Sequence, residues 1–341
     1  MKNSPNSVKR PNNFRHKLRK ILAEITWSAP HSLLGPLKPS ESSVLMYHRV
    51  VEPKEVPWEM EPGMYVTPES FRLQLELLTE NYKVISLQDY VEQTLSGDLQ
   101  AGSIALTFDD GWIDFKQHAA PILKEFNLTA TVFLPTAFIG SEELFWTDIL
   151  SLAIHHCPDK IVEIFSEYKI FTPSGGSNPD SLLSRKNMTL ERAIFALRAA
   201  SPVNRNKIVS ELKGQLPTVP RQFLNWEEIN QLASEGFTFG SHSNLHRAST
   251  EVEASELSQD FQDSKNTLSN SLSSGKLDIF CYPGGYYDSS TQEITNSTGF
   301  KATMAIHRNN ELGFTPPMIG RIGIHEDISY TKKLFNFRLK F

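Results

Sequence analysis

The chain of 341 residues has only two cysteines, Cys157 and Cys281. Two thiols allow at most one disulfide and exclude a metal cage built from cysteines, so packing must provide most of the stability. No stretch of the sequence approaches the roughly 18 consecutive apolar residues of a membrane-spanning helix. A glutamate, a histidine and two prolines interrupt residues 21–37, which argues against a cleaved secretory signal. We therefore expect a cytoplasmic protein.

Acidic residues are missing from the first 20 positions, which carry seven lysines and arginines. Subtracting these seven from the total of 34 leaves 27 basic against 39 acidic residues, a net charge of −12 for the rest of the chain. An acidic body argues against nucleic acid as a partner. Residues 13–27 form a basic amphipathic pattern that is typical of a helix lying on an anionic membrane surface. A helix packed against its own domain explains the pattern at least as well, so peripheral membrane association is one of two alternatives.

After a tail over residues 1–40, short apolar runs alternate with amphipathic helical segments as far as residue 341. This alternation predicts a parallel α/β architecture. Residues 140–222 break the pattern, and we expect them to be a helical insertion with helices at 149–164, 190–199 and 206–216. Trp146 and Asp148 stand near its start, where an aromatic ring and a carboxylate are candidates for binding a sugar. Hydrophobic anchoring of the insertion explains the aromatic residue equally well.

Two adjacent carboxylates, Asp109 and Asp110, end a predicted buried strand and are followed by Gly111. A turn at this point can bring both carboxylates to one centre, where a cation or a shared proton must offset their repulsion. An Asp-Gly turn without a chemical role is the alternative. A later predicted strand ends in His242 and His246, whose spacing lets both imidazoles reach one metal ion.

The motifs TFDDG (residues 107–111) and SHSNLH (residues 241–246) together resemble those of the polysaccharide deacetylase family, the NodB homology domain of carbohydrate esterase 4. The resemblance runs from about residue 43 to the C-terminus and is poor over residues 140–222. It implies a distorted (β/α) barrel of parallel strands over residues 41–341. The implied reaction is hydrolysis of N-acetyl groups from a carbohydrate with N-acetylhexosamine units, either a polysaccharide, a glycolipid or a precursor, with release of acetate.

The resemblance also implies a role for each matching residue. Asp110, His242 and His246 would bind a divalent metal, usually zinc, which polarises the substrate carbonyl and lowers the pKa of a bound water. Asp109 would be the general base. In the third motif, FCYPG, the backbone N–H of Tyr282 would help to stabilise the oxyanion.

The chain departs from the family pattern in two places. Many members carry an arginine where this chain has Cys281, and that arginine orients the base; Arg321 is our first candidate to replace it and Arg49 the second. Most members place the general acid late in the chain as Leu-x-x-His, for which the nearest match ends at His325. However, MYHRV around His48 resembles a permuted branch that includes poly-N-acetylglucosamine deacetylases, in which an early strand supplies this histidine. We therefore favour His48 as the general acid.

Two other functions remain open from the sequence. One is an O-acetyl esterase or another amidase on the same scaffold, because a fold does not fix a substrate. The other is a non-catalytic carbohydrate-binding protein that has kept the metal site. The presence of the metal-binding residues, the base and the acid together argues against the second alternative.

Overall fold

The computed structural model describes residues 42–61, 63–170, 189–307 and 309–340. They form two compact units: a barrel unit with residues 42–51, 63–141 and 223–340, and a helical unit with residues 52–61 and the described part of 142–222. Segment 13–27, and with it the predicted membrane contact, lies outside the described residues. Among the helices of the described ranges, none combines the length and the apolar character needed to cross a bilayer.

Seven parallel strands close into a ring in the barrel unit. In ring order they are β1 (Ser43–Tyr47), β10 (Met318–Gly323), β9 (Ala302–Ala305), β8 (Lys276–Cys281), β7 (Thr238–Ser241), β6 (Thr131–Leu134) and β5 (Ser103–Phe108), and β5 pairs again with β1. The short β4 (Lys83–Val84) pairs with the beginning of β5, and β2 (Arg49–Val50) pairs with β3 (Tyr65–Val66) outside the ring. The distorted (β/α) barrel predicted from the sequence is confirmed.

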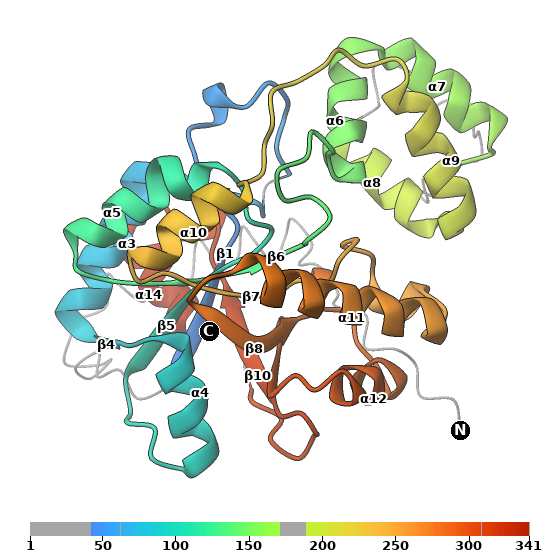
Figure 1. Ribbon diagram of the computed structural model, residues 1–341. Helices are drawn as coiled ribbons and strands as arrows, with labels where there is room; N and C mark the ends of the chain where they lie inside the picture. The colour runs from blue at the N-terminus through green and yellow to red at the C-terminus, as the bar shows by residue number, and fades with distance from the viewer. Residues whose placement is uncertain (1–41, 62, 171–188, 308, 341) are drawn as a thin grey trace. The chain divides into compact units, whose positions relative to one another are not determined.

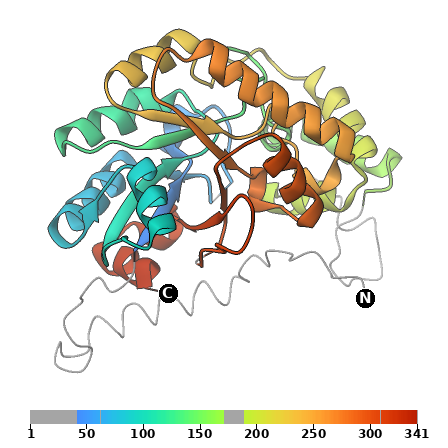
Figure 2. The same ribbon diagram turned by 60° about the horizontal axis from the view of Figure 1, so that its bottom comes forward.

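Helices surround this ring of strands (Figures 1 and 2). They are α3 (Pro68–Asn81), α4 (Leu87–Ser96), the π-helical turn η2 (Phe115–Ala119), α5 (Ala120–Glu125), α10 (Trp226–Ser234), α11 (Ala254–Ser271), α12 (Ser289–Ser297), α13 (Glu326–Ser329) and α14 (Lys332–Lys340). Several of these helices are preceded by residues that favour the start of a helix. Thr67 caps α3 ahead of Pro68, and Asn225 and Glu228 form a capping box at α10.

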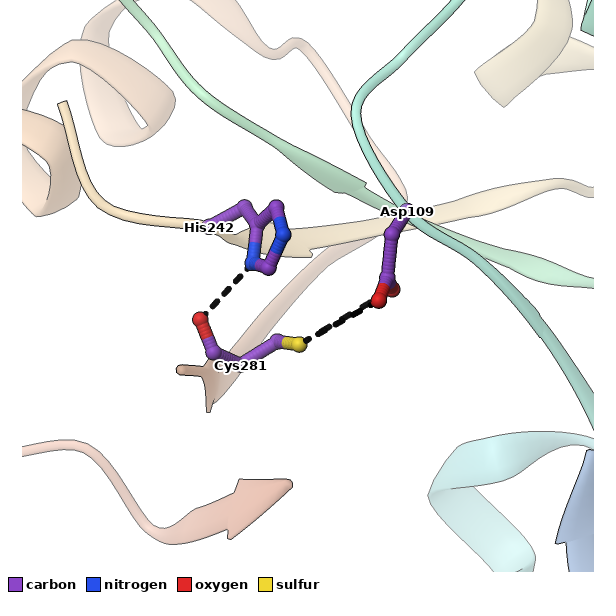
Figure 3. A group of neighbouring side chains, drawn as sticks. All are labelled: Asp109, His242 and Cys281. Atoms are coloured by element: carbon purple, nitrogen blue, oxygen red, sulfur yellow. Dashed lines mark hydrogen bonds between the residues drawn. The ribbon is translucent and has the colours of Figure 1, made fainter. Parts of the chain in front are cut away.

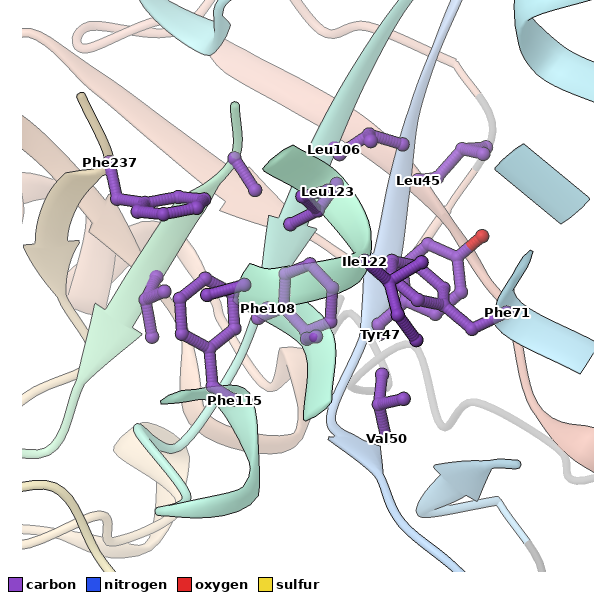
Figure 4. Packing of buried hydrophobic residues seen from close by; sticks show 14 of the residues in the cluster. Leu45, Tyr47, Val50, Phe71, Leu106, Phe108, Phe115, Ile122, Leu123 and Phe237 are labelled. Carbon is purple, nitrogen blue, oxygen red and sulfur yellow. The ribbon is translucent and has the colours of Figure 1, made fainter. Parts of the chain in front are cut away.

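An aromatic cluster fills the space between the strands and these helices (Figure 4). Phe108, the last residue of β5, stacks on Tyr47 of β1 with ring centroids 5.2 Å apart. Phe71 and Phe115 contact the ring of Phe108 edge-on, with ring centroids 5.8 and 4.9 Å from its centroid. Each fully buried ring of this kind contributes about 1.5–3 kcal/mol. The cluster therefore anchors the last residues of β1 and β5, directly before the positions where the predicted site begins.

The helical unit has a hydrophobic cluster of its own. Its helices are α6 (Trp146–His156), α7 (Pro158–Glu167), α8 (Leu190–Ala199) and α9 (Pro202–Lys213). The single helix predicted over residues 149–164 is in fact two, because Pro158 cannot donate a backbone hydrogen bond and instead starts α7. Residues 52–61 join this unit, and Ser151 Oγ donates to Glu59 O at 2.6 Å.

Candidate active site

The two adjacent carboxylates lie in a sharp turn after β5. Asp110 and Gly111 both have left-handed backbone conformations, with φ of 77° and 68°. A Cβ at Gly111 would lie 2.7 Å from Cδ2 of Leu134, so glycine is required there. Aspartate is one of the few other residue types that enters this region readily. As a result, the side chains of Asp109 and Asp110 reach different partners although they are neighbours in sequence.

Asp109 is held by a bidentate ion pair with Arg321 of β10. Arg321 Nη1 donates to Oδ1 at 2.7 Å and Nη2 donates to Oδ2 at 2.8 Å, and both residues are almost fully buried. Burial raises the pKa of Asp109, but the positive charges of Arg321 and His242 outweigh it, so the pKa lies below its usual value. The carboxylate is therefore ionised at neutral pH, as a general base must be.

Cys281 lies where many family members carry an arginine, and it contacts the same ion pair. Figure 3 shows its thiol pointing at the Asp109 carboxylate, with Sγ 3.8 and 3.7 Å from the two oxygens. Arg321 Nη2 lies 2.9 Å from this sulfur. The second candidate, Arg49, instead pairs with Asp114 at 2.7 Å. Of the two arginines considered from the sequence, the structure places Arg321 on the base.

Asp110, His242 and His246 converge on one point. Asp110 Oδ1 lies 3.5 Å from Nε2 of His242 and 3.2 Å from Nε2 of His246. This oxygen is buried and accepts no hydrogen bond. A buried carboxylate oxygen is costly without a partner. One oxygen and two imidazole nitrogens within 4.8 Å of one another match the donor set of a catalytic zinc site, so these residues fit a divalent metal ion.

A backbone carbonyl orients the ring of His242 on the side away from Asp110. Its Nδ1 lies 2.8 Å from the carbonyl oxygen of Cys281 (Figure 3), which places the proton on Nδ1 and leaves Nε2 facing Asp110. Burial opposes ionisation of Asp110, but the imidazoles of His242 and His246 that face it outweigh burial and hold the pKa of this carboxyl well below its usual range. Asp110 therefore stays charged and able to bind a cation.

The loop after β7 carries both histidines in a tight turn. Ser243 and His246 have positive φ of 65° and 53°, and Ser243 Oγ accepts from the backbone N–H of His246 at 2.9 Å. From α11, the buried Asp260 accepts the backbone N–H groups of Asn244 and Leu245 at 3.2 and 2.9 Å. These bonds stabilise the strained backbone that brings the second imidazole to the first.

His48 directly follows β1 and is half-buried. Burial lowers its pKa, while the charges of Asp110 and Asp109 act in the opposite direction and Arg321 and His242 act with burial. These electrostatic neighbours are the predicted base, the predicted metal ligands and the arginine. The structure thus brings His48 together with the other predicted groups of the barrel.

His325 stands beside His48 at the end of the neighbouring strand. The register of β1 and β10 pairs Met46 with Gly323, and both histidines lie two residues further on. Nδ1 of His325 bonds the carboxylate of Asp327, its neighbour in α13. His325 therefore has a carboxylate partner of its own, whereas His48 is influenced by Asp109 and Asp110.

Tyr282 does not fit the role predicted for its backbone N–H. This N–H donates to Met304 O at 3.2 Å, which continues the pairing of β8 with β9. The side chain is fully buried, and its hydroxyl bonds Thr295 at 2.8 Å. The motif was matched correctly to a strand end, but the strand pairing uses the N–H that was assigned to the oxyanion.

Trp146 and Asp148 belong to the helical unit. Asp148 Oδ1 accepts the indole N–H of Trp58 at 3.1 Å, and the guanidinium of Arg205 lies 5.6 Å from the ring centre of Trp146. Both residues thus have partners inside their own unit. Their contact with a substrate stays a prediction.

Two residues of the site were missed from the sequence. Trp112 donates its indole N–H to Asp110 Oδ2 at 3.0 Å, and Asp260 supports the histidine loop as described above. Trp112 directly follows the TFDDG motif, and a polar ring atom so close to two carboxylates could have been noticed. Asp260 gave no signal, because it lies within an ordinary amphipathic helix.

The comparisons with known proteins agree with this arrangement. A family model described as polysaccharide deacetylase matches residues 96–303, more than half of the chain. The chain belongs to the polysaccharide deacetylase family. The match includes both carboxylates, both histidines of the loop and Cys281, whereas His48 and Arg321 lie outside it.

Individual relatives of the polysaccharide deacetylase family are distant. A poly-beta-1,6-N-acetyl-D-glucosamine N-deacetylase of Staphylococcus epidermidis is 30% identical over 87 residues, which are 25% of this chain and 30% of that protein. The structure of deacetylase PplD of Streptococcus pyogenes in complex with acetate is similar with a TM-score of 0.53 at 18% identity, covering 88% of this chain and 99% of PplD. IcaB from Ammonifex degensii has a TM-score of 0.54 at 17% identity, covering 88% and 98%. These structures share the fold.

Proposed function

We propose that this polysaccharide deacetylase family member is a metal-dependent hydrolase that removes N-acetyl groups from a carbohydrate and releases acetate and a free amine. The observation that carries the proposal is the set of groups at one end of the barrel. An arginine-held carboxylate, a candidate metal site of two histidines and one aspartate, and a further histidine beside both carboxylates lie on the strand ends. Amide hydrolysis needs a base, an electrophile and an acid, and this arrangement supplies all three.

Asp110, His242 and His246 would hold the ion, and zinc suits their mixture of oxygen and nitrogen donors. When bound, a zinc ion supplies Lewis acidity toward a carbonyl oxygen and lowers the pKa of water. The chain contributes the orientation of the three donors, through the carbonyl of Cys281 behind His242 and the N–H of Trp112 on Asp110.

Asp109 is the general base that takes the proton of the attacking water. Both of its oxygens already accept from Arg321, but each carboxylate oxygen has a second lone pair for another hydrogen bond. The two bonds to Arg321 restrain the carboxylate in one orientation, which matters because positioning contributes much of general base catalysis.

His48 is the general acid that gives a proton to the nitrogen of the leaving amine as the carbon–nitrogen bond breaks. Burial lowers the pKa of His48, which makes the protonated imidazole a stronger acid but leaves a smaller fraction of it protonated at neutral pH. An amine leaves poorly without a proton, whereas the alkoxide of an O-acetyl ester leaves more easily. Loss of the acid should therefore affect amides more than esters.

The proposed substrate class is a polymer, glycolipid or precursor containing N-acetylhexosamine. The name of the Staphylococcus epidermidis relative, a poly-beta-1,6-N-acetyl-D-glucosamine N-deacetylase, supports this class. The metal-binding, base and acid groups contain nothing specific to one linkage, so the class and not the particular polymer is proposed.

The test is acetate release from N-acetylglucosamine oligomers and from an O-acetylated sugar, using wild type, His48→Ala and His325→Ala. We expect the wild type to cleave the amide. His48→Ala should lower amide cleavage by about 10²–10⁴-fold and preserve more of the ester cleavage, and His325→Ala should be milder on the amide. Acetate released only from the ester by the wild type would reassign the protein as an esterase. An amide defect larger for His325→Ala than for His48→Ala would transfer the acid role to His325.

A further inference from the structure

The indole ring of Trp112 connects the metal site to a buried ion pair that the proposed reaction does not use. Its Nε1 donates to Asp110 Oδ2 at 3.0 Å, and the ring is 2% exposed. The other oxygen of the same carboxylate, Oδ1, accepts no hydrogen bond and faces Nε2 of both His242 and His246. The two oxygens of Asp110 are therefore used differently, one by the protein and one toward the candidate ion.

The ring of Trp112 is fixed on both faces. The guanidinium carbon of Arg49 lies 4.3 Å from the ring centre, and Phe223 stacks nearly parallel at 4.6 Å with an angle of 24°. Two groups at these distances cannot occupy the same face of one ring. Cation–π and stacking contacts of this kind restrict the rotation of the indole.

Arg49 is in turn held in place by Asp114. Its Nε donates to Asp114 Oδ2 at 2.7 Å, and the other oxygen of Asp114 accepts the backbone N–H of Val50 at 3.0 Å. Asp114 and Arg49 are both almost fully buried. An ion pair with this geometry aligns the guanidinium plane, and hence the ring that it covers.

We infer that Trp112 is a positioning residue for the metal site. Its N–H retains Oδ2 of Asp110, so that Oδ1 alone is presented to an ion bound by the two histidines, and Arg49 and Phe223 hold the indole in the orientation that this requires. The inference rests on the proposed function, because it takes Asp110, His242 and His246 as metal ligands. Outer groups that orient a metal ligand typically contribute about 10–100-fold to metal affinity.

The experiment measures the zinc dissociation constant of the full chain by competition with a chromogenic chelator. Trp112→Phe removes the N–H donor and keeps an aromatic ring between Arg49 and Phe223. Trp58→Phe is the matched control, because Trp58 is also buried, at 5% exposed, and its indole N–H also bonds a carboxylate, that of Asp148 at 3.1 Å in the helical unit. We expect Trp112→Phe to bind zinc about 10–100-fold more weakly and Trp58→Phe to bind it like the wild type.

The visible absorption spectrum of bound cobalt(II) provides a second measurement, which a general loss of protein stability would not change. In Trp112→Phe the freed Oδ2 can also reach the ion, so the visible absorption bands of bound cobalt should change in intensity, whereas those of Trp58→Phe should match the wild type. If Trp112→Phe does not fold, 3-benzothienylalanine at position 112 replaces only the N–H by sulfur and preserves the shape of the ring. The same weaker binding is expected from this variant.

The outcomes separate this inference from the proposed function. Wild-type zinc affinity in both Trp112 variants, or equal weakening in Trp58→Phe, would overturn the positioning role of Trp112. A wild type that binds zinc but releases no acetate would refute the proposed reaction, and the comparison of dissociation constants would still decide the role of Trp112. A wild type that binds no zinc would overturn both.

Discussion

Replacement of Arg321 by methionine should be among the most damaging single changes in the barrel unit. Arg321 and Asp109 are 1% and 2% exposed, and their two hydrogen bonds are 2.7 and 2.8 Å long. Removing one partner of such a pair costs about 3–5 kcal/mol, because the other charge is left buried. Total stabilities of about 5–15 kcal/mol allow the variant to fold with a large part of its stability lost. Activity should also fall, since the base loses its orientation.

A second substitution tests whether Arg321 replaces the arginine found at the Cys281 position of many family members. Sγ of Cys281 is 2.9 Å from Nη2 of Arg321 and 3.7–3.8 Å from the oxygens of Asp109. An arginine at 281 can therefore reach Asp109 once the side chain of Arg321 is shortened. We expect Cys281→Arg to restore more than half of the lost stability in Arg321→Met. In the wild type the same change should destabilise by about 3–5 kcal/mol, because it buries a second guanidinium beside Arg321 without a carboxylate of its own.

The assay is urea unfolding followed by far-UV circular dichroism for the wild type, both single variants and the double variant, analysed as a double-mutant cycle. Arg49→Met is the control, because it breaks a different buried ion pair, that with Asp114. Cys281→Arg should not rescue it. A loss below about 1 kcal/mol in Arg321→Met, or equal harm from Cys281→Arg in every background, would refute the reasoning.

Three further outcomes are expected. Gly240→Ala should cost about 1–3 kcal/mol in urea unfolding, because the new Cβ would lie 2.6 Å from Cε1 of Phe133 and 3.0 Å from Ile279 O; a neutral result would show that β6, β7 and β8 can separate. Asp260→Ala should lower the free energy of unfolding by about 1–3 kcal/mol, since two N–H groups of the histidine loop lose their acceptor. It should also weaken zinc binding, and an unchanged zinc affinity would contradict the support that Asp260 gives to the loop. Chelation of a metal present at 100 times its dissociation constant should remove about 2.7 kcal/mol of stability, and an unchanged calorimetric melting temperature would contradict the metal site.

The parallel α/β arrangement could be predicted because its signals are local, whereas closure into a barrel was implied by the family resemblance. Apolar strand segments alternate with amphipathic helical segments, and each of the strands at residues 44–48 and 104–109 ends in a polar residue that the structure places at the candidate site. Asp109 and the histidine loop were therefore noticed from strand ends and motif spacing, whereas His48 was selected through the resemblance to a permuted branch of the family. The helix break at Pro158 was also visible in the sequence, but the periodicity of the apolar residues on both sides concealed it.

The contacts between distant segments could not be derived from local patterns. Arg321 meets Asp109 because β10 and β5 both pair with β1, and nothing near either residue encodes that order of strands. The error at Tyr282 has the same origin, since the pairing of β8 with β9 decides which N–H groups are already used. Asp260 acts through the backbone of the loop, which leaves no trace in the side-chain pattern.

The central claim is that Asp110, His242 and His246 hold a metal ion on which deacetylation depends. Its most direct test is elemental analysis of freshly purified wild type and Asp110→Ala after resupply of zinc, with acetate release from N-acetylglucosamine oligomers measured on the same samples. The account predicts about one zinc per chain and acetate release in the wild type, and the loss of both in Asp110→Ala. A wild type without metal, or acetate release that persists in Asp110→Ala, would contradict it.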